Sequence, residues 1–183
     1  MFLSLVDMLR TRAAEQGSDT SFWYLLDGED DVLDITFASL DRDSRAVAAR
    51  LSEVGRPGDR VVILMAPGPD FLSAFFGCLY AGMIAVPAFL PDMVNIKRSV
   101  PRLQAIAKDA EAVSILTDEL FVAFRDELWD VAPDLARTPW IIVGEATSGG
   151  GGDDWVDPGT NQETTAFIQY TSGSTSLPKG VVL

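Results

Sequence analysis

The chain has 183 residues, which is enough for one domain with a hydrophobic core of its own. Its 48% apolar and 22% charged residues are typical of a globular protein and exclude a disordered or fibrous chain. The formal net charge of −13 argues against nucleic-acid binding, and the absence of histidine excludes a Ser-His nucleophile pair and any His-bearing zinc site.

Hydrophobic periodicity predicts helices and strands that alternate along most of the chain. A helix over about 3–16 comes first, and two strands joined by the Asp27-Gly28 turn form an antiparallel pair near residues 22–37. The elements that follow in chain order are a long helix closed by Gly55, a strand over 61–65, a helix over 71–80, a strand over 83–87, a helix around 103–110, a strand over 113–116, a helix over 119–130 and a strand over 140–143. This order predicts an α/β fold, a layered and mostly parallel sheet with flanking helices, in which the antiparallel pair is an edge feature.

Three local signals refine these expectations. Thr36 is the predicted N-cap of the long helix, and Ser99 is the predicted cap of the helix around 103–110. Pro101 is then tolerated because it falls in the first turn of that helix. Residues 144–160, which include four consecutive glycines, are expected to form an irregular linker within the domain.

The uncharged run from Phe71 to Pro91 is long enough to span a bilayer if it is one helix. The break at Ala81-Gly82 and the proline at its end favour a core helix followed by a buried strand, so no transmembrane segment is expected. Cys78 lies within this run and is the only cysteine, so it is expected to be buried core, in a protein of a reducing compartment. With no signal peptide at the N-terminus, the expected location is cytoplasmic.

The chemistry of the chain is concentrated in its last residues, where an apolar strand leads into a loop of small hydroxylated residues. The hydroxyl and backbone N–H groups from Thr171 to Thr175 provide donors for phosphate oxygens, and Lys179 adds a positive charge. Composition alone would also allow a solvent-exposed Ser/Thr-rich hairpin loop. A Walker A loop is excluded, because Pro178 precedes the lysine and Gly180 follows it.

The phosphate-binding run, residues 170–180 with the sequence YTSGSTSLPKG, resembles position for position the phosphate-binding signature of the adenylate-forming superfamily. The one departure is Ser176, where glycine is most common. Further stretches resemble shared motifs of the superfamily: 35–40 (ITFASL), 58–61 (GDRV) and 79–87 (LYAGMIAVP). Four stretches are most similar to its fatty acyl-AMP ligase branch: 26–29, 75–82, 102–110 and 167–170.

This resemblance implies an enzyme that activates a fatty acid with ATP and Mg²⁺, forms an acyl adenylate and releases pyrophosphate. The fatty acyl-AMP ligase branch then transfers the acyl group to the phosphopantetheine thiol of an acyl carrier protein or a carrier domain of a polyketide synthase. By the same resemblance, Gly180 lets the backbone turn close to the phosphates. The residues implied to hold the β- and γ-phosphates are Thr171, Ser172, Gly173, Ser174, Thr175 and Lys179.

The resemblance covers residues 1–183 as a partial N-terminal, AMP-binding domain that stops just after the phosphate-binding run. The catalytic lysine, the adenine contacts and the acidic Mg²⁺ ligand of the family are expected beyond Leu183, and no metal ligand is predicted within the chain. The 183 residues alone are therefore expected to be inactive. The alternatives are part of an acyl-CoA synthetase, part of an assembly-line adenylation domain, or a non-catalytic folded module that binds a carrier protein or the rest of its own enzyme.

Overall fold

A four-stranded parallel sheet lies at the centre of the computed structural model, which describes residues 2–171 and 178–183. The strands lie in the order β4-β3-β5-β6, so β3, the first of these four along the chain, is in the interior of the sheet. They are β3 (Arg60–Leu64), β4 (Ile84–Pro87), β5 (Ser114–Thr117) and β6 (Trp140–Ile142), and every pair is parallel. The α/β fold with a mostly parallel sheet is confirmed.

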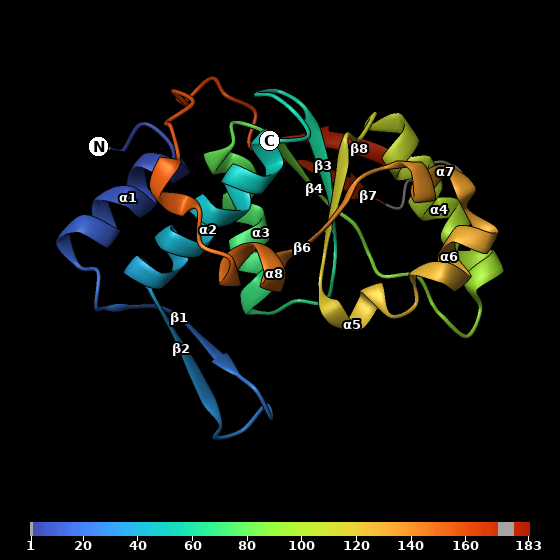
Figure 1. Cartoon of the computed structure of the whole chain (residues 1–183), viewed down its shortest axis with the longest axis horizontal. Coiled ribbons are helices and arrows are strands. Elements are labelled where there is room, and N and C mark those ends of the chain that lie inside the picture. The colour runs from blue at the N-terminus through green and yellow to red at the C-terminus, as the bar shows by residue number, and fades with distance from the viewer. Residues whose placement is uncertain (1, 172–177) are drawn as a thin grey trace.

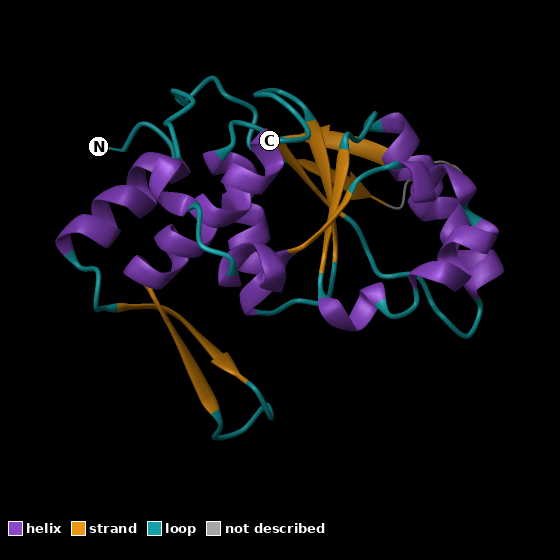
Figure 2. Ribbon diagram, in the orientation of Figure 1, coloured by secondary structure: helices purple, strands orange, loops and turns teal. Residues whose placement is uncertain are grey.

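Helices cover both faces of this sheet, as Figures 1 and 2 show. One layer contains α1 (Leu5–Glu15), α2 (Phe37–Ser52), α3 (Pro69–Tyr80) and α8 (Val143–Ser148). The other contains α4 (Ile96–Asp109), α6 (Arg125–Val131) and α7 (Pro133–Arg137). Val61 and Ile63 of β3 pack into one hydrophobic cluster while Val62 and Leu64 pack into another, because successive strand residues point to opposite faces.

The uncharged run from Phe71 forms a core helix and a strand, as predicted. Helix α3 ends at Tyr80, and Gly82 takes a φ of +68°, which turns the chain into β4. Cys78 is fully buried in α3, and burial raises the pKa of its thiol. Over the described ranges, none of the helices combines the length and the hydropathy needed to cross a bilayer.

The antiparallel strands β1 (Thr20–Leu25) and β2 (Val32–Thr36) form a separate two-stranded sheet, so the prediction of an edge feature is wrong. Figure 1 shows this hairpin projecting away from the layers. The reason lies at Thr36, whose side chain accepts the Ser39 N–H in a capping box that starts α2 directly after β2. The predicted N-cap at Thr36 is thus confirmed, and it ties the hairpin to the end of a helix.

Helix α4 begins earlier than the sequence predicts. Asn95 occupies the N-cap position, and the Asp92 carboxylate accepts the backbone N–H groups of Val94 and Asn95 just before the helix. The Ser99 hydroxyl donates to main-chain carbonyls from inside the helix, so Ser99 is no cap, and Pro101 lies in the helix interior. Asp92 provides the turn chemistry that the sequence predicts at Ser99.

The predicted single helix over 119–130 is also wrong. The chain forms α5 (Glu119–Val122) and α6 (Arg125–Val131), and it is non-helical at Phe124, which precedes α6. The Asp118 carboxylate caps α5 by accepting the Phe121 N–H at 2.7 Å.

Residues 144–160 are only partly irregular, which corrects the prediction of a linker. Helix α8 takes up the first part, and a 3-10 turn, η1, covers Gly152–Asp154. Trp155 then packs against the core, where its indole N–H donates to the Tyr80 carbonyl at 2.7 Å. The segment is anchored to the helix layer in this way.

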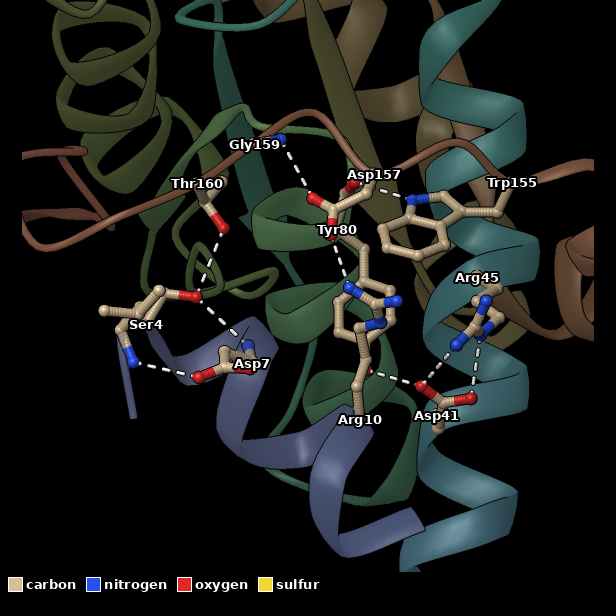
Figure 3. A network of polar contacts seen from close by, with 11 residues as sticks. Ser4, Asp7, Arg10, Asp41, Arg45, Tyr80, Trp155, Asp157, Gly159 and Thr160 are labelled. Carbon is tan, nitrogen blue, oxygen red and sulfur yellow. Dashed lines mark hydrogen bonds and ion pairs between the residues drawn. The ribbon is translucent and has the colours of Figure 1, made fainter. Parts of the chain in front are cut away.

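Two arginines complete this anchor, as Figure 3 shows. The guanidinium carbons of Arg10 and Arg45 lie 5.1 and 4.6 Å from the centre of the Trp155 ring. Arg10 also forms an ion pair with Asp157, and Arg45 donates to Asp41 at 2.7 Å. Helices α1 and α2 therefore both bind the segment that carries Trp155.

Candidate phosphate-binding site

The phosphate-binding run lies at the end of an antiparallel hairpin, β7 (Ile168–Thr171) and β8 (Lys179–Val182). In its register, Thr171 lies opposite Lys179 and Tyr170 lies opposite Gly180. The two polar residues predicted to contact phosphate from either side of the loop are thus neighbours across the ladder. Both residues are exposed.

The hairpin joins the central sheet beside β4. Phe167, just before β7, forms a parallel bridge with Ala85, whose N–H donates to the Ala166 carbonyl at 3.1 Å. Strand β7 therefore runs in the same direction as β4, and both strands end at the same edge of the sheet. Ligands of α/β proteins bind at the carboxyl ends of parallel strands, and this is where Thr171 lies.

Three of the seven residues predicted to contact phosphate lie in the described part of the chain. The structure brings Thr171 and Lys179 together and places Gly180 in β8. The other four predicted residues, Ser172, Gly173, Ser174 and Thr175, lie outside the described residues.

Gly180 has a packing role that the sequence does not indicate. A Cβ atom added at this position would lie 2.7 Å from Ile168 Cγ2 and 3.2 Å from Tyr170 Cζ. The absence of a side chain lets the Tyr170 ring and the Ile168 methyl lie against the backbone of β8. This contact is a reason for glycine that is independent of any ligand.

Tyr170 fixes the start of the run to the helix layer. Its side chain is buried, and its hydroxyl donates to Asp109 Oδ2 of α4 at 2.6 Å. Burial and this hydrogen bond to a carboxylate raise the pKa of Tyr170, so the phenol remains protonated. The sequence gives no signal for this pair, because nothing in it links two residues that lie far apart along the chain.

Across residues 2–171 and 178–183, no three His, Cys, Asp or Glu side chains gather as a metal site. The local chemistry of the described residues is one ammonium group, one hydroxyl and strand-end backbone groups at an exposed edge. This set suits an anion with several oxygen atoms.

A family model described as AMP-binding enzyme matches residues 9–183. The chain belongs to this adenylate-forming family. Over all 183 residues it is 38% identical to the medium-chain-fatty-acid–[acyl-carrier-protein] ligase JamA of Moorena producens, of which it covers 31%. It is 42% identical over 149 residues, 81% of its length, to the long-chain-fatty-acid–AMP ligase FadD32 of Mycolicibacterium smegmatis, of which it covers 23%.

Solved structures of AMP-binding enzymes agree with this assignment. The chain superposes on the fatty acyl-adenylate ligase of Legionella pneumophila, solved with acyl adenylate and pyrophosphate, with a TM-score of 0.78 and 33% identity. The match covers 98% of this chain and 30% of that one. The chain thus spans less than a third of the length of these relatives. The resemblance to the N-terminal part of fatty acyl-AMP ligases is confirmed.

Proposed function

We propose that this chain is the ATP-binding N-terminal part of a fatty acyl-AMP ligase that transfers the acyl group to a carrier protein. The observation that carries the proposal is the hairpin that sets Thr171 opposite Lys179 at the carboxyl edge, within a chain 38% identical to an acyl-carrier-protein ligase. JamA is named as a fatty-acid–[acyl-carrier-protein] ligase, and FadD32 is named as a fatty-acid–AMP ligase.

In the proposed reaction, a fatty carboxylate oxygen attacks the α-phosphorus of ATP. The bond between the α-phosphorus and the oxygen that bridges to the β-phosphate breaks, and pyrophosphate leaves with both electrons of that bond. Lys179 and the Thr171 hydroxyl would stabilise the charge on the leaving group, together with Ser172, Gly173, Ser174 and Thr175. These residues act on the β- and γ-phosphates.

Mg²⁺ is the expected companion of the triphosphate in this reaction. It would neutralise oxygen charge and orient the leaving group, and its contacts would come mainly from the phosphates. The described part of the chain does not itself gather three acidic ligands, so we assign no protein ligand for the ion.

Because the reaction consumes ATP and Cys78 is a free thiol, a cytoplasmic location fits the proposal.

Lys179→Ala tests the proposal in the protein that carries these residues together with the rest of the family's length. We expect kcat/KM for fatty-acid-dependent pyrophosphate release to fall, because the variant loses about 1 to 3 kcal/mol of transition-state stabilisation. Lys108→Ala, which removes an exposed lysine from α4, is the matched control and should leave the rate unchanged. An unaltered rate in Lys179→Ala would remove Lys179 from the site.

Two further measurements separate the alternatives. The 183 residues alone are expected to release no pyrophosphate from ATP and a fatty acid, and turnover by them would contradict the assignment of essential groups elsewhere. Offering free CoA and a phosphopantetheinylated carrier protein to the longer protein distinguishes a carrier-protein ligase from an acyl-CoA synthetase. A protein that binds a carrier protein but forms no acyl adenylate would be a non-catalytic module.

A further inference from the structure

Helix α4 carries a concentration of basic residues on an otherwise acidic molecule. Seven of the fourteen arginine and lysine residues of the chain form ion pairs with carboxylates. Of the seven for which the described residues provide no such pair, four lie on α4. These four are Lys97, Arg98, Arg102 and Lys108, and all are exposed.

Arg98 and Arg102 lie one helical turn apart and line the same cavity. It has a volume of about 440 Å³ and lies between α4 and the segment 89–92 that precedes it. Leu103 and Ile106 form part of its apolar wall. Two guanidinium groups at the wall of an open cavity provide paired donors for carboxylate or phosphate oxygens.

Apolar side chains are exposed in the segment that leads into α4. Phe89, which lines the same cavity, is 75% exposed, and Val94, in the turn before α4, is 91% exposed. Aromatic residues and arginines are the types enriched in protein interfaces, where an apolar anchor is surrounded by charge. Together, Phe89, Val94, Arg98 and Arg102 form what we call the α4 surface.

One acidic residue lines the same cavity and offsets one of its positive charges. Asp92 lines the cavity, but its carboxylate accepts hydrogen bonds from the Asn95 side chain and from the Val94 N–H. These hydrogen bonds lower the pKa of Asp92, so its carboxylate stays ionised in the turn before α4. Lys97, Arg98 and Arg102 leave a local positive excess.

The segment that leads into α4 and the phosphate-binding run follow neighbouring strands. The segment 88–95 leaves the carboxyl end of β4, and the phosphate-binding run leaves the carboxyl end of β7, which lies parallel to β4. The Tyr170 hydrogen bond to Asp109 connects β7 to the same helix. The segment that leads into α4 and the phosphate-binding run therefore leave the sheet at the same edge.

We propose that the α4 surface is the docking site for an acidic carrier protein, with Arg98 and Arg102 pairing with its carboxylates and Phe89 and Val94 filling an apolar contact. The identity of this partner rests on the proposed function. The charge of the chain argues for the location: a net charge of −13 repels an acidic partner over most of the surface, and α4 is where the repulsion is reversed.

The test is the affinity of this chain for an acidic acyl carrier protein, measured by fluorescence anisotropy with a labelled carrier. In the charge-reversed variant Arg98→Glu/Arg102→Glu we expect affinity to fall at least about tenfold, and the fall should shrink as salt screens the charges. Arg42→Glu/Arg50→Glu, which makes the same charge change at two exposed arginines of α2, is the control and should bind nearly as the parent does. An equal loss in both variants, or no loss in either, would overturn the proposal.

Three added measurements test the apolar contact, the role of the phosphopantetheine arm and self-association. Phe89→Ala/Val94→Ala keeps every charge and should also weaken binding, whereas unchanged binding would contradict the apolar contact. A carrier without its phosphopantetheine arm should still bind, and dependence on the arm alone would assign the cavity to the arm instead. Concentration-dependent dimers of the chain that Arg98→Glu/Arg102→Glu abolishes would assign the surface to a second copy.

The proposed function and this inference fail separately. Binding does not require turnover, so a lost affinity for the carrier with normal pyrophosphate release in the longer protein supports the docking surface and the adenylation chemistry together. Normal carrier binding by the charge-reversed variant refutes the docking surface and leaves adenylation untouched. Carrier binding at α4 without any adenylation refutes the proposed enzyme and retains the docking surface.

Discussion

Tyr170 links the start of the phosphate-binding run to α4 through one hydrogen bond of 2.6 Å to Asp109. Tyr170→Phe should lower the free energy of unfolding by about 1 kcal/mol, because it removes the donor and leaves an accessible carboxylate that water can solvate. Urea denaturation measures this change. In the control Tyr24→Phe, which removes a hydroxyl at an exposed hydrogen bond to the Pro67 carbonyl, we expect a smaller loss. If both variants lower the free energy of unfolding equally, the hydrogen bond of Tyr170 does not anchor the run.

Gly180 lies against the Tyr170 ring, and the close contact predicts a cost for any side chain there. Gly180→Ala should destabilise the chain by about 1 to 3 kcal/mol, since the new methyl group would overlap Ile168 Cγ2. Gly144→Ala is the matched control, because the nearest atom to its new Cβ would be Glu119 Oε1 at 3.5 Å and the residue lies within α8. That variant should be neutral or stabilising, by up to about 1 kcal/mol. Thermal unfolding of both proteins decides the sign.

At the scale of an element, the segment 149–160 is anchored by Trp155 between α1 and α2 (Figure 3). Trp155→Ala removes the indole hydrogen bond to Tyr80 and both arginine contacts. We therefore expect the free energy of unfolding to fall by about 2 to 4 kcal/mol. Limited proteolysis should then cleave within 149–160 more rapidly. Trp23→Ala removes an indole that is 75% exposed on the β1-β2 hairpin, and it should change neither quantity appreciably. Unchanged cleavage in Trp155→Ala would show that other contacts hold the segment.

Elements also show where reasoning from sequence succeeds. Thr36 and Ser39 are close in sequence, so the capping box that starts α2 depends only on local hydrogen bonds and is predictable. Ser99 has the same chemical type as a cap, but Asp92 forms the turn before α4, and the helix begins upstream. A cap prediction fails when a second polar residue within a few positions offers the same hydrogen bonds earlier in the chain.

For the whole molecule, the charge imbalance predicts a dependence of stability on salt. A net charge of −13 on one compact chain creates self-repulsion that unfolding relieves, and ions screen it. Between low and physiological salt, the midpoint of thermal unfolding should rise by a few degrees. This rise corresponds to about 1 kcal/mol in the free energy of unfolding. Sodium and potassium chloride at matched ionic strength should act equally. A falling midpoint would mean that the ion pairs contribute more than the repulsion costs.

The order of residues is enough to predict the parallel α/β layers, the core helix and strand over 71–87, and the family to which the phosphate-binding run belongs. These features depend on local periodicity and on the residues of a short motif. Both can be recognised in the sequence without knowledge of the fold. Val61 to Leu64, an unbroken apolar run, already indicates a strand buried on both faces.

Which distant residues meet is a property of the folded molecule. The contact between Tyr170 and Asp109 and the contacts of Trp155 with Arg10 and Arg45 both join segments far apart in sequence. The separation of the β1-β2 hairpin from the main sheet is of the same kind. Strand pairing and side-chain contact at long range depend on how whole layers pack, and a pattern along one segment does not contain that information.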